Sequence, residues 1–81
     1  MRGVSKAQEA ILFALIHGGA LSVDQLAREA RCLGLRTRIA VGELANRGAV
    51  VCPSGSARYQ ITATGRELAA AVGVNRRQVR V

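Results

Sequence analysis

Hydrophobic and polar positions alternate with a helical period in the N-terminal part of the chain. Ser5 and Gln8 form a capping box, in which the serine hydroxyl accepts from a free backbone amide and the glutamine reaches back to the cap. Small and aliphatic residues then recur at intervals of three and four, as on the buried face of a helix. The run ends at His17, directly before two glycines. The pattern predicts a helix over residues 6–17.

A second capping box, Ser22 with Gln25, opens the next apolar stripe. Leu21 and Leu26 flank this start as a hydrophobic staple, so two independent signals agree on the boundary. The stripe predicts a second helix that ends at Gly34, where glycine supplies the left-handed residue of a helix C-cap.

A third helix is predicted over about residues 36–47, and Gly48 ends it. Two β-prone stretches follow at residues 49–52 and 58–62, and the Pro-Ser-Gly-Ser-Ala sequence between them indicates a hairpin turn. Thr62 is expected to cap a fourth helix that ends near Gly73.

This order of elements resembles the winged helix-turn-helix, and three segments resemble the corresponding sequences of MarR-type regulators. Residues 21–27 (LSVDQLA) open the second helix, residues 43–50 (ELANRGAV) lead into the hairpin, and residues 61–68 (ITATGREL) leave it. The resemblance implies a mainly α winged-helix domain over residues 1–73, with three helices, a two-stranded wing and a fourth helix. Residues 74–81 would then form a basic C-terminal tail.

Two features depart from the MarR-type pattern. The hairpin turn lacks the acidic residue followed by arginine that is often found at the wing tip of that family, and Arg58 stands just after the turn. MarR-type regulators are also longer, with terminal helices that build a dimer and a ligand pocket. The sequence therefore gives little support for a small-molecule effector.

The third predicted helix has an inward and an outward face. With Leu44 at the centre of the inward face, Thr37, Ala40, Val41 and Gly48 fall within about 60 degrees of it. The opposite face offers arginine, which can donate two hydrogen bonds to guanine in the major groove, and asparagine, which can pair with adenine. The candidate DNA-contacting residues of this helix are Arg36, Thr37, Arg38, Ile39, Gly42 and Asn46.

Two residues of the outward face have alternative interpretations. Gly42 costs about 1 kcal/mol relative to alanine in mid-helix, which is explained either by close approach to a partner or by tight packing against a neighbouring element. Ile39 either contacts a thymine methyl group or is buried by a slight rotation of the helix.

The hairpin and the tail supply the remaining candidates. The resemblance implies that Ser54, Ser56 and Arg58 lie near phosphates, where contacts position a protein without reading sequence. For Arg58 the alternative is a solvated surface charge. Arg76 and Arg77 are expected in a flexible arm over a groove or phosphates, with a soluble tail or an exchanged strand as alternatives.

The charge of the chain favours a polyanionic partner. The 81 residues include 12 Lys and Arg against 5 Asp and Glu, a net charge of +7. Residues 36–81 carry eight arginines and two glutamates, and hence +6 of that total. One Phe, one Tyr and no Trp argue against the stacking surfaces of single-strand and RNA-binding proteins. Double-stranded DNA is therefore the expected nucleic acid.

Several classes of protein are excluded or disfavoured. A chain of this length forms one small domain. One His and two Cys without CxxC spacing provide neither a nucleophile with its base nor a metal site, so no enzyme, metal or cofactor is expected. Free thiols are favoured over a disulfide between Cys32 and Cys52. No apolar stretch reaches the roughly 20 residues of a membrane span, and Glu9 argues against a signal peptide.

The sequence thus predicts a small sequence-specific DNA-binding protein, a transcriptional repressor or regulator in the cytoplasm of a bacterium or phage-infected host, associated with the nucleoid. It is expected to act as a homodimer through the fourth helix, whose apolar residues exceed what one face needs. Two alternatives remain open: a winged-helix module that binds and inhibits a host protein, and an architectural DNA-binding protein of recombination or replication. The apolar residues of the fourth helix are Leu68, Ala69, Ala71 and Val72.

Overall fold

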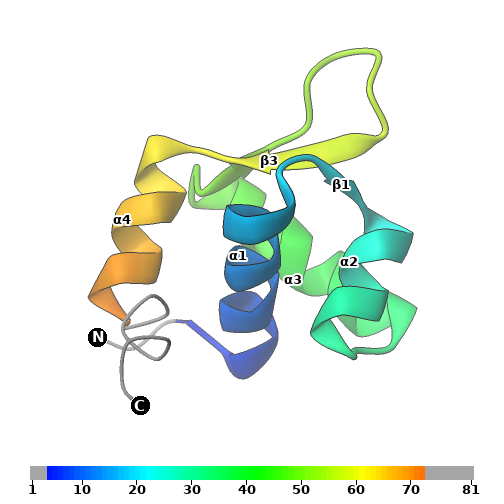
Figure 1. The fold of residues 1–81 in the computed structure, drawn as a ribbon, viewed down its shortest axis with the longest axis horizontal. Helices are drawn as coiled ribbons and strands as arrows, with labels where there is room; N and C mark the ends of the chain where they lie inside the picture. The colour runs from blue at the N-terminus through cyan, green and yellow to red at the C-terminus, as the bar shows by residue number, and fades with distance from the viewer. Residues whose placement is uncertain (1–3, 73–81) are drawn as a thin grey trace.

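Helices and short strands make up residues 4–72, the part of the chain that the computed structural model describes (Figure 1). Their order confirms the predicted winged helix-turn-helix. The predicted basic tail lies outside the described residues. The elements are α1 (Lys6–Gly18), β1 (Leu21–Ser22), α2 (Val23–Ala30), α3 (Gly34–Asn46), β2 (Val50–Val51), β3 (Arg58–Ile61) and α4 (Ala63–Ala71).

Three helices begin at the side-chain caps that the sequence predicts. The hydroxyls of Ser5, Ser22 and Thr62 each accept from the backbone N–H three residues later, at 3.0 to 3.2 Å. At Ser22 the capping box is complete, because Gln25 Oε1 accepts from the Ser22 N–H at 2.9 Å. At Ser5 only half of the expected box forms, since the Gln8 side chain bonds to α3 instead.

The end of α2 differs from the prediction. The left-handed residue is Arg31, with φ 56° and ψ 43°, and the expected Gly34 is the first residue of α3. The N–H of Cys32 donates to Ala27 O at 3.0 Å, which closes the last turn of α2 three residues early. The third helix therefore starts two residues before the predicted boundary.

The strands form a three-stranded antiparallel sheet in the order β1-β3-β2. The predicted hairpin is confirmed by the pairing of Val50 with Ile61. Leu21 pairs with Tyr59, which adds β1 as a third strand that the sequence did not predict because it is only two residues long. Thr62 Oγ1 donates to Gly48 O at 2.6 Å and ties the exit of the hairpin to its entry.

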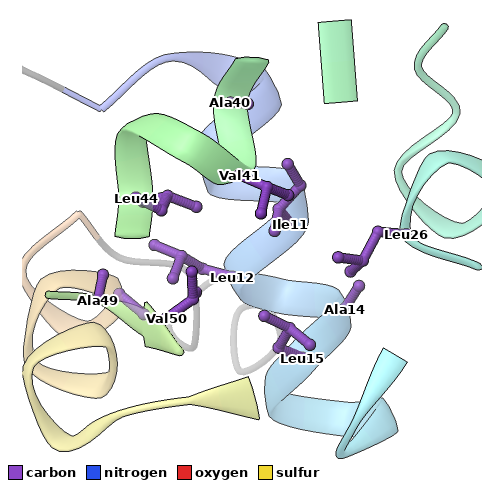
Figure 2. Packing of buried hydrophobic residues seen from close by; sticks show 11 residues of the cluster. Ile11, Leu12, Ala14, Leu15, Leu26, Ala40, Val41, Leu44, Ala49 and Val50 are labelled. Carbon is purple, nitrogen blue, oxygen red and sulfur yellow. The ribbon is translucent and has the colours of Figure 1, made fainter. Parts of the chain in front are cut away.

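The core is built around α1, which contacts α2, α3, α4 and β3. Figure 1 shows α1 between α4 and α2, with α3 behind it. Figure 2 shows Val41 of α3 beside Ile11 of α1, and the α3 side chains Val41 and Leu44 are both at most 2% exposed. The direction of α3 is thus set by the apolar face of α1.

The apolar residues of the fourth helix are divided between the core and the surface. Ala69 is fully buried, and Leu68 and Val72 pack against the core. The exposed apolar residues of α4 are small ones, including Ala70 and Ala71. Of the four residues predicted for the dimer surface, Ala69 is buried, Leu68 and Val72 are partly buried against the core, and Ala71 is exposed. A dimer contact through α4 stays a prediction.

Candidate nucleic-acid interface

The side chains of α3 divide into an inward and an outward set, as the helical period predicts. Thr37, Ala40, Val41 and Leu44 are buried. All other residues of α3 are exposed. The predicted site residues among them are Arg36, Arg38, Ile39, Gly42 and Asn46.

Thr37 corrects the predicted set. Its side chain is 0% exposed, and its hydroxyl donates to Leu33 O at 3.0 Å, one turn earlier. A buried hydroxyl that is satisfied by a local carbonyl serves the fold. Thr37 therefore stabilises the first turn of α3 and does not offer its side chain to a partner.

Two of the alternatives raised by the sequence can be checked in the structure: burial of Ile39 by a rotated helix, and tight packing of Gly42 against a neighbouring element. Ile39 is 55% exposed, so the helix is not rotated to bury it. A Cβ built on Gly42 meets nothing within 4 Å in the described part of the molecule. Tight packing within residues 4–72 does not account for this glycine, and the outer side of α3 is open there.

Sequence reasoning missed two exposed apolar residues next to this face. Leu33 is 77% exposed and Leu35 is 71% exposed. The predicted third helix begins one residue after Leu35, so the predicted set does not include this residue. The available signal was its spacing of four from Ile39, which places both side chains on one side of a helix.

The acidic residue of α3 is held by α1. Gln8 Nε2 donates to Glu43 Oε1 at 2.6 Å, and Arg47 Nη1 donates to Gln8 Oε1 at 3.4 Å. Gln8 is 6% exposed, so this contact is sheltered on one side. It fixes the position of the only carboxylate of α3 at the edge nearest α1.

The hairpin provides exposed polar residues on a defined turn. Gly55 has φ 81°, and the Ser56 N–H donates to Pro53 O at 3.0 Å. Ser54, Ser56 and Arg58 are all exposed. Arg58 belongs to β3 and pairs with Ser22 of β1, so its backbone is held by the sheet. Figure 1 shows the hairpin loop projecting beyond the helices.

That Arg58 acts together with the outward residues of α3 stays a prediction. Arg76 and Arg77 lie outside the described residues, so the prediction of a basic arm is untested. Among the helices of residues 4–72, none is long and apolar enough to cross a membrane. In the same residues, no three His, Cys, Asp or Glu side chains gather as metal ligands would.

Searches of protein-family models and of curated proteins find no match to the chain. Solved structures do match. A MarR family protein of Mycobacterium tuberculosis is 30% identical, with 96% of this chain and 60% of that chain covered and a TM-score of 0.76. A MarR family transcriptional regulator of Silicibacter pomeroyi DSS-3 is 23% identical, with 91% and 55% covered and a TM-score of 0.77.

A third similar structure is the Bordetella bronchiseptica protein BpsR, whose DNA binding is regulated by 6-hydroxynicotinic acid. It is 20% identical, with 91% of this chain and 57% of that chain covered and a TM-score of 0.77. The chain thus spans a little over half the length of the solved structures it matches. These likenesses and the order of elements show that the chain has a MarR-like winged-helix fold.

Proposed function

We propose that the protein binds double-stranded DNA with sequence specificity and regulates transcription, as a repressor that occludes a promoter. In this proposal α3 enters the major groove and the hairpin lies on the DNA backbone. The observation that carries it is the outward side of α3, where Arg38 and Asn46 stand exposed on either side of the open position of Gly42, with Arg36 exposed toward one edge.

The chemistry of this side suits base edges. An α-helix fits the major groove, where an arginine fork donates to O6 and N7 of guanine and an asparagine pairs with adenine. Without a side chain, Gly42 lets the helix backbone come close to the bases. The net charge of +7 adds attraction to phosphates for any sequence.

The wing is proposed to position the protein. Ser54, Ser56 and Arg58 are exposed donors on and beside the hairpin turn, and such groups commonly bond to phosphate oxygens. Arg76 and Arg77 of the tail would add further phosphate contacts. These residues are expected to raise affinity for all sequences and to contribute little to selectivity.

We further propose that the protein acts as a homodimer on a palindromic site, because paired recognition helices read two half-sites one helical turn apart. Within the described residues, a contact through α4 would have to use its exposed side, around Ala70 and Ala71. The proposal is of a cytoplasmic, non-catalytic protein without a cofactor, in keeping with the transcriptional regulators it resembles in fold.

Selection from a pool of random duplexes, followed by mobility-shift titration at several salt concentrations, tests this function. A sequence-specific protein enriches a defined motif and keeps its preference as salt lowers all affinities. An architectural protein would bind every duplex alike. A protein-interaction module would bind no duplex at moderate salt, and either result would refute the proposal.

A further inference from the structure

Exposed large apolar side chains gather at the start of α3. Five such side chains stand out in residues 4–72, and three of them belong to one stretch of seven residues that overlaps the proposed reading helix. Leu33, Leu35 and Ile39 are more than half exposed, whereas single exposed residues elsewhere need no explanation. The five side chains are Phe13, Leu33, Leu35, Ile39 and Val51.

Two of these residues share a line along α3 with the candidate base-reading positions. At 100 degrees per residue, Leu35, Ile39, Gly42 and Asn46 fall within about 60 degrees of one another. We call these four residues the α3 row. Along this row Leu35 and Ile39 are apolar, Gly42 has no side chain, and Asn46 carries an amide.

We propose that Leu35 and Ile39 read thymine methyl groups, so that the DNA site carries thymines opposite the first two turns of α3. This inference rests on the proposed function and names the bases that the function prefers. The C5 methyl of thymine is the apolar group that A·T pairs present in the major groove, and aliphatic side chains recognise it by excluding water.

The charges beside the α3 row favour DNA as the occupant. Arg36 and Arg38 lie between Leu35 and Ile39 in the sequence. At 100 degrees per residue each arginine falls about 60 degrees from one of these two residues, on opposite sides of the α3 row. The carboxylate of Glu43 accepts from Gln8 Nε2 at 2.6 Å, at the edge of α3 nearest α1. An apolar strip with a cationic border is complementary to a methyl-bearing groove between phosphates.

Gly42 strengthens the assignment of Leu35 and Ile39. A Cβ at Gly42 would meet nothing within 4 Å, so the helix backbone is uncovered about one turn after Ile39. Methyl contacts need van der Waals approach, and a side chain at this position would hold the helix off the bases. The open glycine and the apolar pair therefore serve the same close approach.

Leu33, Leu35 and Ile39 also line an open hollow of about 440 Å³ between α3 and the start of α1. The other residues of its lining are Ser5, Ala7, Arg36, Ala40 and Glu43. If a protein segment or a second copy of the chain occupied this hollow, Leu35 and Ile39 would not contact thymine methyl groups. The test below separates these occupants.

The experiment compares thymine with deoxyuridine, which lacks only the C5 methyl group. Sites selected from a random duplex pool are resynthesised with each thymine replaced singly by deoxyuridine, and dissociation constants are measured for the 81-residue chain. At one or more positions in each half-site, removal of the methyl should weaken binding about threefold to tenfold, the fold-change expected for one buried methyl group.

Ile39→Ala and Leu35→Ala assign the methyl contact to side chains. Both residues are exposed, so the variants should keep the helical circular dichroism of the parent. Each should bind the thymine site less tightly and show less than a twofold preference for thymine over deoxyuridine at its own position. Phe13→Ala, which removes an exposed apolar side chain from α1, should keep the full preference.

The outcomes distinguish this inference from the function it rests on. A protein that enriches no motif from the pool refutes the proposed function. Enriched sites that bind deoxyuridine and thymine equally refute the thymine contact and leave the function standing. The contact is also refuted if Ile39→Ala and Leu35→Ala both keep the preference, or if they instead change the oligomeric state in sedimentation or abolish capture of a protein partner.

Discussion

Gln8 of α1 and Glu43 of α3 are joined by a hydrogen bond of 2.6 Å between Nε2 and Oε1, across 35 residues of sequence. Arg47 donates to the other atom of the same amide, Gln8 Oε1, at 3.4 Å. One glutamine thus contacts two charged residues, one in the last turns of α3 and one directly after the helix ends. Together with the apolar contacts of α1, it sets the position of the helix that carries the proposed DNA contacts.

Gln8→Ala should lower the free energy of unfolding by about 1 to 2 kcal/mol, because it removes hydrogen bonds to charged groups at a nearly buried site. Urea denaturation followed by circular dichroism measures the change. Gln60→Ala, which removes an exposed glutamine side chain from β3, is the control and should change stability by less than about 0.5 kcal/mol. Equal effects of the two substitutions would show that the hydrogen bonds of Gln8 contribute nothing to stability.

The starts of the helices could be predicted from the sequence because cap chemistry is local. Ser22 and Thr62 each bond to an amide three residues away, and the residue types needed stand side by side in the chain. The end of α2 could not be predicted in this way. Arg31 adopts a left-handed conformation, which is uncommon for arginine and is usually found at glycine. Gly34, the residue that the sequence favours for this conformation, begins α3 instead.

The candidate interface was predictable as far as it depends on helical period. The exposed positions of Arg38 and Asn46 follow from the buried position of Leu44, since the three are set by one rotation of the helix. Leu35 was missed because its assignment depends on where α3 begins, which is set by the turn after α2. The surroundings of Gly42 are a tertiary property, and only the structure shows that they are open.

Gly65→Ala should destabilise the fold, since a Cβ at this position would clash with the Ala49 carbonyl oxygen and lie 2.6 Å from Ile61 Cγ1. The Ala49 carbonyl cannot move freely, because its oxygen also accepts from the Thr62 N–H at 3.0 Å. Overpacking of this kind costs about 1 to 3 kcal/mol, and thermal unfolding measures it. A melting temperature equal to that of the parent would show that α4 can shift away from the sheet.

Gly42→Ala should have opposite effects on stability and on DNA binding. The added methyl group meets open space, and alanine in mid-helix is favoured over glycine by about 1 kcal/mol, so the variant should be more stable. If the backbone of α3 approaches the bases at this position, the same methyl group should weaken specific binding about tenfold. Denaturation and mobility-shift titration of the same preparation measure the two effects. Unchanged affinity would mean that the glycine is not kept for close approach.

Arg38→Ala should reduce selectivity more than it reduces binding to random duplexes. An arginine that contacts a guanine edge contributes about 1 to 3 kcal/mol to discrimination, which corresponds to about a fivefold to hundredfold loss of preference for the selected site. The matched control is Arg66→Ala, which removes the same charge from the exposed side of α4. It should leave the ratio of specific to random binding within about twofold and change only the salt dependence, if anything. Titrations of both variants against selected and scrambled duplexes at two salt concentrations measure these ratios. Equal losses for the two variants would mean that Arg38 acts only as a positive charge, and the base-reading role of α3 would then have to be abandoned.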